Sequence, residues 1–66
     1  MNIIPLNQKE LAFVVGAAQG KTQKQIAREL GVSPSRVKEH AERARLKLGA
    51  INTPQAVFNA QKAGII

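Results

Sequence analysis

The chain has 66 residues, no cysteine, one histidine and a formal net charge of +6, with ten lysines and arginines against four acidic residues. Disulfides and cysteine-ligated metal centres are excluded, and no apolar run approaches the ~18 residues that span a membrane. A chain this short forms one domain that buries about 60% of the surface exposed by its unfolded form. The charge favours a polyanionic partner, whereas the scarcity of aromatic residues argues against single-stranded nucleic acid held by base stacking.

The first part of the chain predicts one short helix after a lead-in at residues 1–5. Asn7 is the expected N-cap, and Glu10, three residues later, is its capping-box partner. Gly20 ends the segment. Apolar residues at helical spacing form the expected inner face of this helix, namely Leu11, Val14, Val15 and Ala18.

The next two segments have the pattern of a helix-turn-helix. Thr22 with Gln25 caps a second helix, and Gly31 supplies the positive φ that ends it and turns the chain. Ser33 caps a third helix, predicted at about residues 33–48. In such a unit the later of the two helices, here the predicted third helix of the chain, can enter the DNA major groove. The expected core residues of the pair are Ile26, Ala27, Leu30, Val37, Ala41, Ala44 and Leu48.

A fourth helix is predicted at about residues 54–63. Thr53 followed by Pro54 repeats the pattern of a cap and a proline at the first helical position. Its expected inner face consists of Ala56, Val57, Ala60 and Ala63. Four short helices without a strand pattern predict an all-α domain over residues 6–66.

The outer side of the third helix carries residue types that contact bases. Lysine donates to guanine O6 and N7, and glutamate accepts from the N4 amino group of cytosine. Because recognition helices contact bases mainly from their N-terminal half, the candidates for base contact are Ser35, Lys38, Glu39 and Glu42. The alternative interpretation is a solvated charged face, in which Glu39 pairs with Arg43 and Glu42 with Arg45.

Other side chains suit the DNA backbone. The start of the second helix offers free N–H groups to a phosphate, and basic residues flank both helices. The candidates for phosphate contact are Thr22, Lys24, Arg36, His40, Arg43 and Lys47. Packing of His40 against the second helix is the alternative for that residue. The sequence holds no set of residues suited to catalysis, to a cofactor or to a metal ion, so no enzyme is predicted.

With these features the chain resembles the LuxR-type (GerE-like) helix-turn-helix domain of bacterial transcription factors. The resemblance covers residues 6–66 without a gap, and the residues that carry it include Leu6-Asn7 with Glu10, Thr22-Gln23-Lys24-Gln25-Ile26-Ala27, Leu30-Gly31-Val32-Ser33-Pro34, Val37-Lys38-Glu39-His40, Lys47-Leu48-Gly49 and Gly64-Ile65-Ile66. It implies four helices, of which the second and third bind DNA and the fourth pairs two protomers on a two-fold site.

Four residues of the third helix depart from the pattern of that family, among them Ala44, which replaces a larger aliphatic core residue. Arg36 replaces a usual threonine, and Glu39 and Glu42 stand where neutral or basic residues are frequent. Acidic groups there repel phosphates unless they meet cytosine amino groups or are neutralised by neighbouring arginines.

The fourth helix predicts a partner surface, because Phe58 lies off its inner face. With Gln55 and Lys62 it forms the expected homodimer interface, so the predicted partners are double-stranded DNA and a second copy of the chain. The alternative function is a protein-interaction module that forms heterodimers with longer regulators of the same family. No small-molecule ligand is expected.

The lead-in at Met1–Pro5 lacks the basic region followed by a long apolar core that marks a signal peptide, so the expected location is the cytoplasm. It is also short and apolar, unlike a flexible tether. We therefore expect a DNA-binding domain that stands alone rather than one trimmed from a longer regulator.

Overall fold

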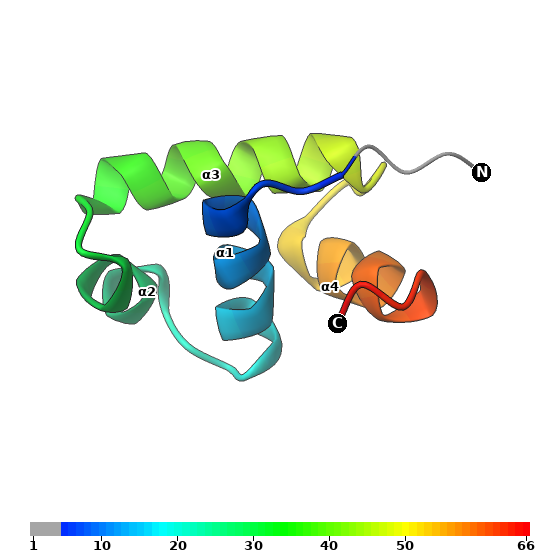
Figure 1. Ribbon diagram of the computed structural model, residues 1–66, viewed down its shortest axis with the longest axis horizontal. Helices are drawn as coiled ribbons and strands as arrows, with labels where there is room; N and C mark the ends of the chain where they lie inside the picture. Colours follow the sequence, from blue (N-terminus) through cyan, green and yellow to red (C-terminus); the bar gives the residue numbers. More distant parts are fainter. Residues whose placement is uncertain (1–4) are drawn as a thin grey trace.

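The computed structural model describes residues 5–66, so the predicted lead-in lies outside the described residues except for Pro5. The described chain forms α1 (Gln8–Ala18), α2 (Gln23–Leu30), α3 (Pro34–Lys47) and α4 (Thr53–Lys62). These residues include no strand, and the prediction of an all-α domain with four helices is confirmed. In Figure 1, α3 runs along one side of the molecule, and α1 lies beside it between α2 and α4.

The first two helices begin with the predicted capping boxes. The Glu10 N–H donates to Asn7 Oδ1 at 2.9 Å, and the Asn7 N–H donates to Glu10 Oε1 at 3.0 Å. Thr22 and Gln25 make the same reciprocal pair at 3.1 and 2.8 Å. These bonds satisfy backbone N–H groups that have no partner inside the helix, which fixes where each helix starts.

The start of α4 differs by one residue from the prediction. Asn52, not Thr53, is the N-cap, and its Oδ1 accepts from the Gln55 N–H at 2.8 Å. The prediction placed Pro54 at the first helical position, but a proline is equally compatible with the second, where its missing N–H also costs no helical bond. Ala63, predicted to face inward, is exposed just past the end of the helix.

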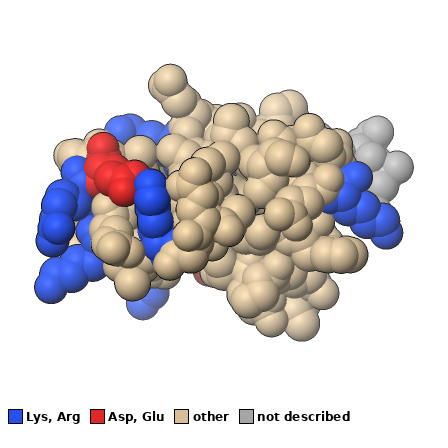
Figure 2. Space-filling view, turned by 90° about the horizontal axis from the view of Figure 1, so that it is seen from below, with Lys and Arg blue, Asp and Glu red and all other residues tan. Residues whose placement is uncertain are grey.

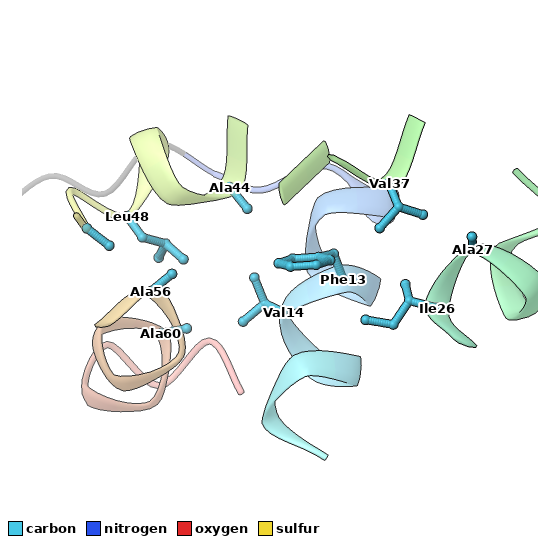
Figure 3. Close-up of a cluster of buried hydrophobic side chains, with 10 residues drawn as sticks. Phe13, Val14, Ile26, Ala27, Val37, Ala44, Leu48, Ala56 and Ala60 are labelled. Atoms are coloured by element: carbon cyan, nitrogen blue, oxygen red, sulfur yellow. The ribbon is translucent and has the colours of Figure 1, made fainter. Parts of the chain in front are cut away.

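The hydrophobic core forms around α1. Figure 3 shows Phe13 and Val14 of α1 at its centre, with side chains of α2 and α3 on one side and of α3 and α4 on the other. The other buried members of this cluster are Ile26, Ala27, Val37, Ala44, Leu48, Ala50, Ala56 and Ala60. Leu30, Ala41 and Val57, also predicted for the core, are partly buried and pack against it.

Burial along α1 covers a different set of residues from the one predicted. Phe13 and Gly16 are buried together with Val14, whereas Val15 and Ala18 are exposed. The helix packs against α2, α3 and α4 at once, so its buried sector is wide and is not centred on one apolar stripe.

Gly16 allows α1 and α2 to approach closely. A Cβ atom at this position would lie 2.9 Å from Ile26 Cγ1, closer than real contacts of this kind allow. The glycine therefore serves the packing of α2 against α1, which in turn supports the helix-turn-helix unit. None of the helices in residues 5–66 is both long and apolar enough to cross a membrane.

Candidate nucleic-acid interface

α2 and α3 form the predicted helix-turn-helix unit. Gly31 takes a φ of 69° at the end of α2, and the Val32 N–H donates to the Ala27 carbonyl at 3.1 Å. This left-handed glycine closes the turn, since a residue with a Cβ atom is strained there. Ile26 of α2 and Val37 of α3 are buried in the shared core, so the opposite face of α3 is left in solvent.

The exposed face of α3 brings the candidate base-contacting residues together. All four predicted residues line one open hollow of about 530 Å³, and Arg43, predicted for phosphate contact, lines it with them. The set is Ser35, Lys38, Glu39, Glu42 and Arg43. Its first members follow the N-cap Ser33 within the first turns of the helix, where base-contacting residues of recognition helices lie.

Both glutamates of this hollow pair with arginines of α3. Glu42 pairs with Arg45, as the alternative interpretation of the charged face expects, with 2.5 Å between Glu42 Oε1 and an Arg45 terminal nitrogen. Glu39 pairs with Arg36 at 4.0 Å, whereas the alternative interpretation paired it with Arg43. Arg43 and Lys38 form no ion pair with any residue of the 5–66 range. The hollow therefore holds two cations outside any ion pair of the described chain, beside two glutamates that are paired.

The N-terminus of α2 adds a second cationic region. Thr22 and Lys24 are exposed there as expected, while Lys21 is held by Glu29 at 2.8 Å. Figure 2 shows lysine and arginine side chains around the end of the molecule where α2 and the start of α3 lie in Figure 1. An acidic patch interrupts them on the face shown. Cations and helix N–H groups in this arrangement suit phosphates.

Lys47 has a different environment from the other phosphate candidates. Its ammonium lies 2.6 Å from Oε1 of Glu10, a fully buried carboxylate, and its side chain is only 26% exposed. Burial would raise the pKa of Glu10, but hydrogen bonds from Lys47 and the Asn7 N–H, with the charges of Lys47 and Arg43, hold that pKa below its ordinary value. Lys47 therefore joins the end of α3 to the start of α1, a contact that local sequence patterns do not reveal.

His40 lies partly buried on α3. Its Nδ1 is buried and has no hydrogen-bond partner among residues 5–66. A contact with phosphate has to be made through the other ring nitrogen, Nε2. In the same range no three histidine, cysteine, aspartate or glutamate side chains are grouped as they would be to hold a metal ion.

The outer face of α4 is apolar at its start. Phe58 is 60% exposed, as the sequence predicts, and Ile51, just before the helix, is 78% exposed. The Ile51 N–H donates to Gln55 Oε1 at 2.8 Å, so the Gln55 amide is engaged within its own chain. Lys62 is exposed on the last turn. Ile51 was not predicted for this surface, because it precedes the helix and helical spacing does not place it; its hydrogen bond to Gln55 brings it beside the start of α4.

A four-helix domain that presents a charged helix from a helix-turn-helix unit belongs to the class of helix-turn-helix DNA-binding domains. The family model for bacterial regulatory proteins of the luxR family (GerE) matches residues 5–60. The chain belongs to this family, which confirms the resemblance found in its sequence. Domains of this family bind DNA and regulate transcription, and the family is not one of enzymes. No curated protein matches the chain significantly.

Proposed function

We propose that this chain is a sequence-specific regulator of transcription that binds double-stranded DNA with α3 in the major groove. The observation that carries this proposal is the single hollow on α3 that gathers every predicted base-contacting residue. Two cations of this hollow, Lys38 and Arg43, form no ion pair within the described chain. Lys38 suits guanine O6 and N7, and Arg43, nearly one and a half turns further along, suits a phosphate.

The backbone of the duplex would be held on both sides of α3. Thr22 and Lys24 contribute from the N-terminus of α2, and Arg36 and His40 contribute from α3. Ser35 is exposed at the start of α3 and donates to a base edge or a phosphate. We leave Lys47 out of this set, because Glu10 holds its ammonium inside the fold.

A fluorescence anisotropy titration at several salt concentrations tests this function. Wild-type protein should bind a duplex at low salt, and log K should fall linearly with log salt. Lys24→Ala should lower the slope by about 1, as expected for a lost phosphate contact. Lys9→Ala, which removes the same charge from an exposed site on α1, is the matched control and should leave binding unchanged. Absence of binding to any duplex at low salt would refute the proposal.

Pairing of two copies through α4 completes the proposed function. Gln55, Phe58 and Lys62 follow one another at spacings of three and four residues along one side of α4, and the exposed Ile51 lies just before the helix, where its N–H donates to Gln55. Such a stripe buries apolar surface when two copies meet, and a two-fold pair would place its α3 helices about 34–36 Å apart on the DNA. In sedimentation, wild-type protein should bind a duplex with two half-sites as two protomers per duplex, and Phe58→Asp should bind as one. Lys9→Asp is the control and should behave as wild-type protein does.

The same apolar stripe supports a second candidate function, the formation of heterodimers with longer regulators of the family. Under this alternative, the contact made by Phe58 is essential and Lys38 is dispensable. Lys38→Ala and Phe58→Asp therefore separate the two candidates in a reporter assay in cells. Loss of activity with Lys38→Ala supports DNA binding, whereas loss with Phe58→Asp alone supports the heterodimer.

A further inference from the structure

Arg45 links the DNA-facing side of α3 to the turn that follows the helix. One terminal nitrogen of its guanidinium donates to the Ala50 carbonyl oxygen at 2.8 Å, and the other donates to Glu42 Oε1 at 2.5 Å. The Ala50 N–H in turn donates to the Arg45 carbonyl at 3.0 Å. Ala50 is buried in the core, so the guanidinium is anchored to a fixed part of the fold.

The environment of Arg45 differs from that of an arginine in contact with phosphate. Its side chain is 27% exposed, and both of its terminal nitrogens are already used within the chain. Arg36 provides the contrast, because its side chain is largely exposed and its nearest carboxylate oxygen is 4.0 Å away. A solvated pair of that kind restrains its partner little, whereas a short charge-assisted hydrogen bond from an anchored guanidinium fixes the orientation of a carboxylate.

The carboxylate of Glu42 is therefore held in one orientation by Arg45, whereas the carboxylate of Glu39 is not held in this way. Only Oε1 of Glu42 takes a hydrogen bond from residues 5–66, which leaves Oε2 as an acceptor in the hollow on α3. A cytosine N4 amino group is the donor that a carboxylate accepts from in the major groove. The nearby guanidinium also offsets repulsion between the carboxylate and DNA phosphates, and the fixed geometry lowers the entropy lost on binding.

We infer that Arg45 is a positioning residue that holds Glu42 in place to contact the N4 amino group of a cytosine. Arg45 itself touches neither base nor phosphate. This inference rests on the proposed function of α3 in the major groove. It assigns Glu42 a role in sequence specificity. Lys38 precedes Glu42 by four residues on the same side, so the half-site should contain one G·C pair that depends on Lys38 and another that depends on Glu42 and Arg45.

The test begins with selection of bound duplexes from a randomised pool, using wild-type protein and the variants Glu42→Gln, Arg45→Met and Arg45→Lys. The duplex enriched by wild-type protein is then compared with duplexes in which each G·C pair is changed to A·T. Arg43→Met, which removes a charge from the same hollow without touching Glu42, is the matched control. Circular dichroism melting checks that each variant is folded.

Wild-type protein should prefer one G·C pair by about tenfold through Glu42. Glu42→Gln and Arg45→Met should both lose that preference and keep the one that depends on Lys38. Arg45→Lys retains the charge but cannot bridge Glu42 and Ala50, so it should lose most of the preference as well. The salt slope of binding should stay unchanged in all three variants, whereas Arg43→Met should lower it by about 1 for every sequence.

Two results would overturn the inference. The first is an Arg45→Met variant that keeps the wild-type base preference, and the second is one that lowers the salt slope as Arg43→Met does. If Arg45→Met fails to fold, Arg45→Lys and Glu42→Gln carry the same comparison. Failure of wild-type protein to bind any duplex removes the proposed function and this inference together, while binding without a preference that depends on Arg45 removes the inference alone.

Discussion

The buried pair of Glu10 and Lys47 offers the sharpest test of how α1 and α3 are held together. Replacing Lys47 by methionine keeps the aliphatic stem but removes the ammonium that lies 2.6 Å from Glu10 Oε1. The carboxylate then stays fully buried, with Oε2 already lacking any hydrogen-bond partner among residues 5–66. The Asn7 N–H remains as a donor to Oε1.

Removal of one partner of a buried ion pair costs about 3–5 kcal/mol, because the other charge is left uncompensated. A small domain has about 5–15 kcal/mol of stability in total, so Lys47→Met should lose a large part of it. At about 4–8 °C per kcal/mol for a domain of this size, the melting temperature should fall by more than about 12 °C. Glu10→Gln should cost less, since the amide oxygen still accepts from Asn7 and Lys47 can turn toward solvent.

Urea unfolding followed by circular dichroism measures the stability of both variants. The measurement is repeated from about pH 3 to about pH 8, a range that spans the titration of carboxylates. The pKa of Glu10 in the folded chain lies below its ordinary value of 4.5, so the unfolded chain binds a proton first as pH falls. The stabilisation is therefore complete above pH 4.5 and is lost as pH drops through the lowered pKa. Glu10→Gln should lack this loss.

Lys9→Met is the control, because it removes an exposed lysine from α1 without breaking an ion pair in the described chain. If Lys47→Met unfolds at the same urea concentration as Lys9→Met at neutral pH, the pair does not hold α1 and α3 together. An unchanged acid dependence of stability in Glu10→Gln would contradict the role assigned to this carboxylate.

Other parts of the fold give further expected outcomes. Gly16→Ala should lower stability in thermal melting by about 1 kcal/mol net, because overpacking against Ile26 exceeds the gain in helix propensity. Asn52→Ala should cost about 1 kcal/mol through loss of the α4 cap, while Thr53→Ala should cost less, and urea unfolding distinguishes them. Phe58→Ala should weaken dimer formation on DNA without lowering thermal stability, since the ring is largely exposed.

Local patterns predicted most of the fold because each helix start depends on residues three positions apart. The capping boxes at Asn7 and Thr22 and the cap at Ser33 form as predicted, and Gly31 turns the chain with positive φ. The cap of α4 was misplaced because Asn52 and Thr53 are both good caps and only the backbone geometry distinguishes them.

Contacts between distant residues were the part that the sequence could not provide. Lys47 and Glu10 are 37 positions apart, so nothing in the local pattern of α3 separates this lysine from its exposed neighbours. The same holds for Arg45, whose link to Ala50 depends on how the chain turns after α3. The candidate base-contacting residues were easier to predict, because helical periodicity alone places them on one side of α3.

Selection of bound duplexes from a randomised pool tests most sharply whether α3 recognises bases in the major groove. We expect enrichment of two inverted half-sites about one helical turn apart, each containing a G·C pair whose enrichment disappears in Lys38→Ala. A pool that shows no enriched sequence with wild-type protein, or the same enriched sequence with Lys38→Ala, would contradict the claim that α3 recognises bases in the major groove.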